Sequence, residues 1–385
     1  MSWNQRDLPN GFDPIAAGPD LVWANEDRIL AGWGVLHRID VSTGAHRAAD
    51  ALAQLAEVVA PGAWKAFFSF TFDRDRTGSV LIVPEMIVEG DGVHRRLIHH
   101  QDVDALPDVA PEFEVDRPRY AGSSLPDLLW LDAVAEAISV IRGGSAEKIV
   151  LARDLAVWSE KPFDTRRLVR RLRTRFPECF TYLVDGLVGS FPELIARRTG
   201  SKVESIAVAG SAPRSDDPQQ DRELGEDLLN SEKDIHEHLL AADSVAAVLE
   251  LLCSDLDRSH RSLLQLDNIH HLQTSFSGTL REPVHLLELA DKIHPSAAVG
   301  GTPTDVALAE IIRLEKMDRA RYAGPVGWFD EDGDGEAAIA LRCAQISGAR
   351  ARLFAGTGIV SGSLPEDELE ETRVKLQAMM GALEY

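Results

Sequence analysis

Cysteine is scarce in this chain of 385 residues, which contains only Cys179, Cys253 and Cys343. They lie far apart in the sequence, and none belongs to a C-x-x-C pair or to the cysteine and histidine spacing of a zinc site. The spacing therefore favours neither a disulfide framework nor a structural zinc site. We expect a protein of a reducing compartment, the cytoplasm.

Long apolar runs are also absent. No stretch of the sequence approaches the roughly 18 to 20 consecutive apolar residues that a membrane-spanning helix requires. The first residues, MSWNQRDLPNGFDP, are polar and unlike a secretory signal. The composition, with 44% hydrophobic and 26% charged residues, is instead typical of a globular protein, so we expect no membrane as a partner.

Positive charge is in deficit. The chain has 40 Lys and Arg against 62 Asp and Glu, which gives a formal net charge of -22. Nucleic acids and anionic membranes bind basic surfaces, so this balance disfavours both as partners. A small anionic substrate is compatible with it, provided that a divalent cation or a few local Arg and Lys side chains offset the negative field.

The order of strand-like and helix-like segments predicts sheets covered by helices. We divide the chain into an N-terminal α/β part, residues 1–126, and a larger part, residues 127–385, which together form one compact domain. Residues 1–28 contain three prolines and little periodicity, which predicts an irregular lead-in. Residues 100–126 are rich in Pro and Asp and predict a linker.

One acidic segment, DEDGDGE at residues 330–336, begins like a calcium-binding loop. The twelfth position of such a loop must be a bidentate carboxylate, but here it is Leu341. Asp and Gly also supply the backbone geometry of tight turns, so the segment predicts a hairpin turn between two strands.

The C-terminal stretch from Pro365 to Leu383 predicts a helix that carries Glu368, Glu371 and Lys375 on one face, beside an apolar stripe. Carboxylates held beside a core are candidate metal ligands. The same spacing is also typical of a surface helix with ordinary Glu and Lys pairs. The residues of this stretch alone leave both interpretations open.

A second carboxylate of interest, Glu237, lies in the segment DIHEH. This segment is not a zincin motif, because His236 and His238 would point to different sides of a helix. Glu237 becomes a candidate metal ligand only if another carboxylate converges on it. Two glutamates with water and an anionic substrate would suit Mg²⁺, which prefers oxygen ligands.

Ten short segments then follow one another in a recognisable order. They are EKIVLAR, GSFPELIAR, AVAGSAPR, LLNSEKDIHEH, LQTSFSGTL, IHPSAAVGGTP, DRARYAGPVGWFDEDGDGE, IALRCAQI, LFAGTGIVSGS and DELEETRVKL. With these segments, the chain resembles the chorismate-utilising enzymes from about residue 147 to residue 383. The resemblance implies an α+β fold in which two large antiparallel β-sheets pack together with helices outside, and an active site between the sheets.

The resemblance also implies the ligands of that site. The substrate would be chorismate, a small molecule, and the protein would be a monomer. A Mg²⁺ ion would be held by Glu237 and Glu371, with Glu368 as a neighbouring carboxylate of the same site. The positions that match substrate-binding residues of the family are Gly210, Ser211, His294, Ala298, Val299, Arg342, Gly356, Gly358 and Lys375.

Two further positions match the catalytic groups of family members that use water. Lys148, at the start of KIVLAR, matches the general base that activates water for attack at ring carbon C2. Glu193, in PEL, matches the general acid that protonates the departing C4 hydroxyl on the far side of the ring. A base and an acid on opposite faces suit a displacement in which the double bond shifts.

Within the family, the chain is most similar to the isochorismate synthases, because Ala298 and Val299 resemble their small apolar pair and His294 is retained. This implies a Mg²⁺-dependent, reversible conversion of chorismate into isochorismate, an isomerase activity that serves menaquinone, catecholate siderophore or salicylate synthesis. The alternatives are a salicylate synthase, which also eliminates pyruvate, an anthranilate synthase-like enzyme, and a non-catalytic relative that binds chorismate. Phe191, where the family usually has Ser or Thr, keeps the last alternative open.

Overall fold

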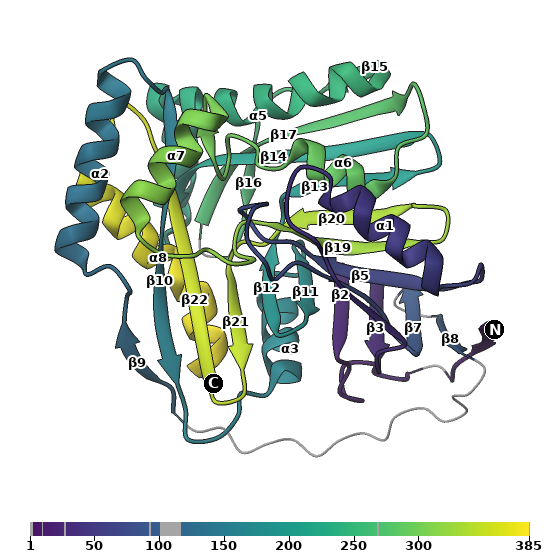
Figure 1. Cartoon of the computed structure of the whole chain (residues 1–385). Coiled ribbons are helices and arrows are strands. Elements are labelled where there is room, and N and C mark those ends of the chain that lie inside the picture. Colours follow the sequence, from purple (N-terminus) through teal and green to yellow (C-terminus); the bar gives the residue numbers. More distant parts are fainter. Residues whose placement is uncertain are drawn as a thin grey trace.

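The computed structural model describes residues 3–9, 11–26, 28–91, 94–100, 117–267 and 269–384. Its strands form two large antiparallel sheets, and its helices lie outside them (Figure 1). This confirms the predicted fold class. The helices are α1 (Arg47–Val58), α2 (Asp127–Arg142), α3 (Thr165–Arg175), α4 (Pro218–Asn230), α5 (Glu232–Leu252), α6 (Leu286–Ile293), α7 (Thr304–Glu315) and α8 (Pro365–Glu384).

Within the described residues, the first sheet has twelve strands. Their order is β1 (Trp3–Asp7), β8 (Arg95–His100), β7 (Met86–Asp91), β3 (Arg28–Trp33), β2 (Leu21–Asn25), β11 (Phe180–Val184), β12 (Leu187–Phe191), β21 (Cys343–Ser347), β22 (Arg350–Ile359), β10 (Lys148–Trp158) and β18 (Gly301–Thr302), and β9 (Arg119–Gly122) also pairs with β10. Strands of the N-terminal part therefore pair directly with strands of the larger part, as β2 does with β11.

The second sheet has ten strands in the part of the chain that the structure describes. Their order is β15 (Cys253–Arg258), β17 (Ile269–Leu280), β14 (Lys202–Pro213), β13 (Leu194–Thr199), β20 (Gly335–Ile339), β19 (Pro325–Asp330), β5 (Lys65–Ser69), β6 (Val80–Val83) and β4 (His37–Asp40), and β16 (Ser262–Gln265) also pairs with β17. Both sheets thus mix strands from the two parts of the chain, and the division at residue 126 stays a prediction.

The chain passes between the two sheets at two places that matter for function. Residues 192–193 lead from β12 in the first sheet to β13 in the second, and residues 340–342 lead back from β20 to β21. Glu193 and Arg342, which lie in these crossings, are therefore buried between the sheets, at 3% and 7% exposure. Arg342 also has a left-handed backbone, with φ of 46°.

Two predictions about loops are wrong. The N-terminal lead-in contains β1 and β2, because the prolines fall between these strands rather than within them. The proposed linker contains β9, which pairs with β10; residues 101–116 of that linker lie outside the described residues. A short polar edge strand such as β1 and a strand such as β2, with four consecutive buried apolar residues, both lack the alternation that identifies strands in a sequence.

The acidic segment at residues 330–336 is a hairpin, as predicted. It joins β19 to β20, and Gly333 adopts a positive φ of 74°. The backbone N–H of Asp330 donates to the carbonyl oxygen of Asp334 at 2.9 Å, which closes the turn. The segment therefore acts as a turn of the second sheet.

Glu336, at the end of this hairpin, links the two sheets. Its carboxylate accepts hydrogen bonds from Trp23 Nε1 at 2.7 Å, Arg197 Nε at 2.7 Å and Trp328 Nε1 at 3.3 Å. The side chain is buried, so loss of the carboxylate would leave these donors without their acceptor. Buried polar groups without partners are a main cause of large destabilisation.

We therefore expect Glu336→Ala to lower the free energy of unfolding by about 3 kcal/mol. Urea or guanidinium denaturation followed by fluorescence measures this change. Glu370→Ala is the control, because Glu370 forms an exposed ion pair with Arg373 at 3.1 Å and such pairs contribute about 0 to 1 kcal/mol. Equal effects of the two substitutions would contradict the linking role of Glu336.

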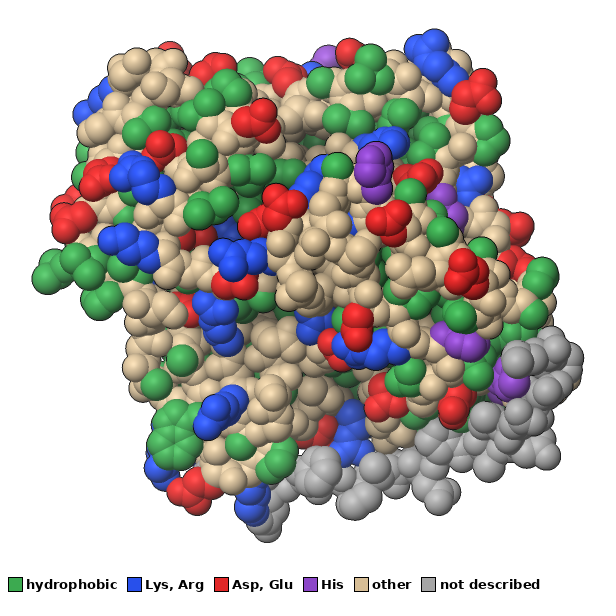
Figure 2. Space-filling model, viewed as in Figure 1, with side chains coloured by type: hydrophobic (Ala, Val, Ile, Leu, Met, Phe, Trp, Pro, Cys, Tyr) green, Lys and Arg blue, Asp and Glu red, His purple; other side chains and the backbone are tan. Residues whose placement is uncertain are grey.

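None of the described helices is long and apolar enough to cross a membrane. On the face drawn in Figure 2, red and blue side chains are interspersed, and the blue ones form no continuous band. This distribution resembles an ordinary mixed surface rather than a basic nucleic-acid-binding surface.

Candidate active site

A small cavity of about 50 Å³ lies between the two sheets, beside both crossings of the chain. Nine of the residues that the sequence proposed line it: Gly210, Ser211, Glu237, Ala298, Val299, Arg342, Gly356, Gly358 and Lys375. The rest of the lining is Val150, Phe191, Val208, Ala209, His271, Arg319, Tyr322, Ala323, Leu341 and Thr357. Residues from distant segments of the sequence thus meet at one place.

Lys148 lies behind this lining, at the first position of β10. Its side chain is completely buried, and its Nζ lies 3.0 Å from Glu237 Oε1 on α5, although the geometry is not that of a hydrogen bond. The contact depends on Gly358 in the neighbouring strand β22. A Cβ at position 358 would lie 2.1 Å from Glu237 Oε1 and 2.7 Å from Lys148 Cε. Only glycine leaves room for this ion pair.

Glu193 is buried between the sheets, and its Oε2 has no hydrogen-bond partner among the described residues. Burial raises its pKa to about 8, although the charge of Lys148 and the backbone N–H of Val208 act in the opposite direction. Desolvation outweighs both, because a carboxylate loses its hydration between the sheets. Glu193 therefore carries a proton at neutral pH, close enough to Lys148 to feel its charge.

Glu371, on α8, does not line the cavity but contacts two residues that do, Ser211 and Lys375. Its Oε1 accepts a hydrogen bond from Ser211 Oγ at 3.1 Å and forms an ion pair with Lys375, one helical turn further on. Burial raises the pKa of this carboxyl, but the charges of Lys375 and Lys233 and the Ser211 hydroxyl outweigh burial and lower the pKa to about 2. Glu371 is therefore an anion at any physiological pH.

Glu368 is the most buried carboxylate of this group, at 1% exposure. Lys233 Nζ on α5 donates to Glu368 Oε1 at 2.7 Å, and Thr357 Oγ1 on β22 donates to Glu368 Oε2. Burial and the neighbouring charge of Glu371 raise its pKa, and Lys233 opposes this shift. Both carboxylate oxygens of Glu368 are therefore engaged by protein donors.

Arg342 and His271 form a second polar group in the cavity, and the sequence analysis missed His271. His271 Nδ1 lies 3.1 Å from the carbonyl oxygen of Gly210, which can only accept, so Nδ1 carries the proton. His271 Nε2 then accepts from Arg342 Nη2 at 3.4 Å. Burial and the charge of Arg342 lower the pKa of His271 to about 3, so the ring stays neutral. The only sequence feature that could have indicated His271 as a site residue is the pair of adjacent histidines in IHHLQTS.

Gly210 has a structural reason to be glycine. It adopts a positive φ of 77° at a register shift of β14, between the pairs formed by Ala209 and Ser211. The left-handed region is costly for residues with a Cβ. The shift turns the carbonyl of Gly210 to His271 and the hydroxyl of Ser211 to Glu371.

His294 is not in the cavity wall. Its Nε2 donates to the carbonyl oxygen of Ala323, at 2.9 Å, and Ala323 itself lines the cavity. Burial, followed by the charge of Arg47, lowers the pKa of His294 well below its usual value. His294 instead lines a larger cleft of about 790 Å³, which shares Arg319 with the small cavity. Its position supports the cavity wall from behind.

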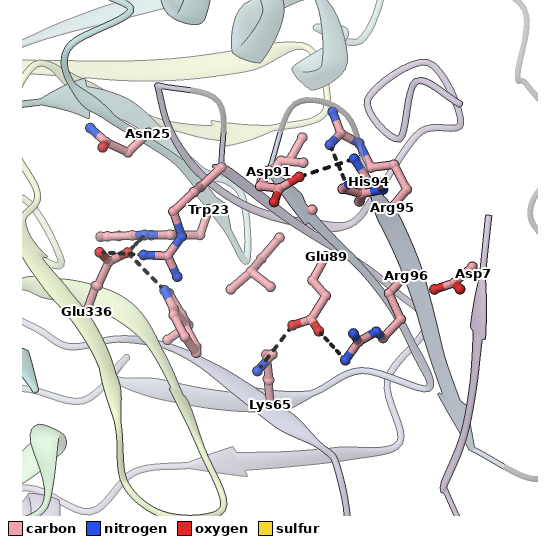
Figure 3. Close-up of a pocket in the computed structure, with 15 residues that line it drawn as sticks. Asp7, Trp23, Asn25, Lys65, Glu89, Asp91, His94, Arg95, Arg96 and Glu336 are labelled. Carbon is pink, nitrogen blue, oxygen red and sulfur yellow. Dashed lines mark hydrogen bonds and ion pairs between the residues drawn. The ribbon is translucent and has the colours of Figure 1, made fainter. Parts of the chain in front are cut away.

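A different cleft, of about 280 Å³, lies near the N-terminal strands and contains none of the proposed site residues. Figure 3 shows that its charged side chains point toward one another. Lys65 and Arg96 both pair with Glu89, at 3.3 and 3.7 Å, and Glu336 is held as described above. The smaller cavity is the better candidate for catalysis, because nine of the proposed site residues line it and none lines this cleft.

Comparison with known proteins decides the family. A family model described as chorismate binding enzyme matches residues 69–384 of the chain, well over half of its length. The chain belongs to the chorismate-binding enzyme family. The expected resemblance is thereby confirmed, and it extends further toward the N-terminus than residue 147, where the recognisable segments begin.

Several chorismate-binding enzymes are close in sequence or structure. Isochorismate synthase DhbC of Bacillus subtilis is 40% identical over 267 residues, which are 66% of this chain and 67% of DhbC. Isochorismate synthase EntC of Escherichia coli K12 is 38% identical over 253 residues, 64% of this chain and 65% of EntC. The aligned residues thus span about two thirds of the length of these relatives.

The structural comparison covers nearly the whole chain. The crystal structure of DhbC from Bacillus anthracis superimposes with a TM-score of 0.83 and 31% identity, and covers 97% of each chain. The two-sheet architecture of this chorismate-binding enzyme is therefore shared from end to end, including the N-terminal strands that carry no recognisable motif.

The donor chemistry of the site fits the Mg²⁺ ion that the resemblance implies. Among the described residues no group of three or more His, Cys, Asp or Glu side chains is arranged as a metal cage. Mg²⁺, however, is typically bound by one or two carboxylates, with water and substrate oxygens completing its octahedron. Glu237 and Ser211, which line the cavity, and Glu371, which accepts a hydrogen bond from Ser211, offer oxygen atoms only.

Proposed function

We propose that this chorismate-binding enzyme converts chorismate reversibly into isochorismate. The named relatives support this function, because DhbC and EntC are isochorismate synthases. The observation that carries it is a pair of groups buried behind the cavity lining: Glu193, which is protonated at neutral pH, and Lys148, whose charge acts on Glu193. This isomerisation requires an acid and a base that act on opposite faces of the same ring.

In the proposed reaction, Lys148 accepts a proton from water while the water oxygen forms a bond to C2 of the ring. The ring double bond shifts, the bond from C4 to its hydroxyl oxygen breaks, and Glu193 gives its proton to that oxygen, which leaves as water. Lys148 needs a free lone pair for this step, so the ammonium that pairs with Glu237 must first lose a proton, which also ends the ion pair.

The remaining cavity residues would bind the substrate. Arg342 and Lys375 supply positive charge for its carboxylates, and the backbone at Gly210, Gly356 and Gly358 allows close approach of a ligand. Ala298 and Val299 give the ring a small apolar wall. Glu237 and Glu371 would hold Mg²⁺, which, when bound, neutralises negative charge on the substrate carboxylate.

Product analysis tests this proposal. Purified protein is incubated with chorismate and Mg²⁺, and the products are separated by chromatography. We expect isochorismate and chorismate at equilibrium, and loss of the conversion when EDTA removes the metal and its return when Mg²⁺ is added. Salicylate and pyruvate as products, without an added lyase, would instead identify a salicylate synthase.

The lack of space for a side chain at position 358 gives a second prediction. We expect Gly358→Ala to reduce turnover by about 100-fold, because a displacement of a catalytic group by about 1 Å costs this much. The added methyl group would collide with Glu237 and with Lys148. Gly362→Ala is the matched control, since no atom lies within 4 Å of a Cβ at that position. Equal turnover of the two variants would contradict the steric argument.

A further inference from the structure

Lys233 links the two helices that carry the proposed metal ligands. Helix α5 packs on β14 and β17 of the second sheet, and α8 packs on β22 of the first sheet (Figure 1). Lys233 precedes Glu237 by one helical turn, and Glu368 precedes Glu371 by three residues, so each pair lies on one helix face. The hydrogen bond from Lys233 Nζ to Glu368 Oε1, at 2.7 Å, therefore joins the two faces.

The ammonium group of Lys233 interacts with more than Glu368. Its pKa is raised: burial lowers it, but the charge and hydrogen bond of Glu368 and the charges of Glu371 and Glu237 outweigh burial. One lysine thus compensates part of the negative charge of three carboxylates. Thr357 engages the other oxygen of Glu368, so that neither oxygen of this carboxylate is free.

We propose that Lys233 is a positioning residue that sets the ligand number of the metal site. By binding Glu368, it keeps this carboxylate away from the metal, and Mg²⁺ is held by Glu237 and Glu371 alone. This inference rests on the proposed metal site. It explains why a helix with two adjacent carboxylates, Glu368 and Glu371, contributes only one of them to the ion.

The physical consequence concerns affinity and selectivity. Without Lys233, the site gains a net negative charge and Glu368 gains a free oxygen, so a divalent cation would find three carboxylates. More carboxylate ligands increase cation affinity and favour Ca²⁺, which takes six to eight oxygen ligands, over Mg²⁺. Lys233 would therefore keep the affinity moderate and the site selective for Mg²⁺.

A double-mutant cycle measured by titration calorimetry tests this, with metal-free protein, Mg²⁺ or Ca²⁺, and no chorismate. We expect Lys233→Met to bind Mg²⁺ at least about fivefold tighter, with a larger gain for Ca²⁺. Glu368→Gln should bind Mg²⁺ about fivefold more weakly, because Lys233 then repels the ion without compensation. The double variant should lie within about twofold of the unmodified protein.

The controls separate this role from a general loss of structure. Lys233→Arg should restore Mg²⁺ affinity close to that of the unmodified protein, because it keeps the charge and the pair with Glu368. Lys202→Met removes a lysine that contacts Thr279 at the other end of β14 and should leave Mg²⁺ affinity unchanged. Thermal unfolding of each variant confirms that it is folded. If Lys233→Met does not fold, the Mg²⁺ affinity of Glu368→Gln alone tests the inference.

Several outcomes would overturn the inference: no binding of Mg²⁺ by the unmodified protein, unchanged or weaker binding by Lys233→Met, or unchanged binding by Glu368→Gln. Chorismate conversion by the unmodified protein is measured separately. A protein that shows the expected affinities but forms no isochorismate would refute the proposed function and leave the role of Lys233 intact.

Discussion

Replacing Lys148 with methionine should reduce the conversion of chorismate by about 1,000-fold, since a positioned general base contributes about 100-fold to 10,000-fold. Methionine fills a similar volume at this completely buried position but cannot accept a proton. The reaction is followed as isochorismate formation at saturating chorismate and Mg²⁺, which reports the turnover number.

The variant Lys148→Arg distinguishes a role as a base from a role in charge compensation. Arginine keeps the positive charge beside Glu237, but its guanidinium does not lose a proton in proteins. If Lys148 acts as a base, both variants are inactive. If Lys148 only compensates the charge of Glu237, the arginine variant keeps most of its activity. Near-normal turnover of the methionine variant would remove Lys148 from the reaction altogether.

Replacing Glu193 with glutamine should reduce turnover by about 100-fold to 10,000-fold, because glutamine has the shape of a protonated glutamate but no acidic proton to donate. The folded structure should tolerate this change well, as the native side chain is already neutral at pH 7 according to its pKa of about 8. Activity is measured as for Lys148, and an active glutamine variant would rule out Glu193 as the acid.

The raised pKa of Glu193 also predicts how activity and stability depend on pH. Only the protonated carboxyl can donate, so turnover should fall as the pH rises through about 8. The folded pKa lies above the ordinary value of 4.5, so the folded state binds the extra proton. The corresponding stability is complete below pH 4.5 and is lost as the pH rises through about 8.

A glutamine at position 193 cannot titrate, so this loss should be absent from the variant. Denaturation with urea at about pH 6 and pH 9 compares the two proteins. We expect the difference in free energy of unfolding to shift in favour of Glu193→Gln at the higher pH. A difference that is independent of pH would show that Glu193 has an ordinary pKa in the folded protein.

The helix that carries Glu368, Glu371 and Lys375 shows how far the sequence could be interpreted. Its periodicity placed the three side chains on one face, and the structure has α8 at Pro365–Glu384. Periodicity could not distinguish a surface ladder from a site wall, because that depends on what the face contacts. In the structure, Glu368 is 1% exposed and bound by Lys233 and Thr357, and Lys375 lines the cavity, so the face packs against the protein rather than solvent.

His271 is a cavity residue that the sequence did not indicate. Nothing in its local sequence distinguishes it from His270, the next residue along β17. His271 contacts Arg342 and Gly210 across the cavity, whereas His270 contacts Asp221 on α4 at 3.0 Å. Adjacent residues of a strand point to opposite faces, and only the position of the strand in the sheet determines which face meets the cavity.

The sequence by itself identified the family and, through that resemblance, the two-sheet fold class and nine of the nineteen residues that line the cavity, because the ordered motifs are a property of the chain alone. Only the tertiary structure decided that Lys148 pairs with Glu237, that Glu193 keeps its proton, and that His294 lies behind the cavity wall. These properties depend on burial and on distances between side chains that are far apart in the sequence. Desolvation and ion pairing arise only when the two sheets bring them together.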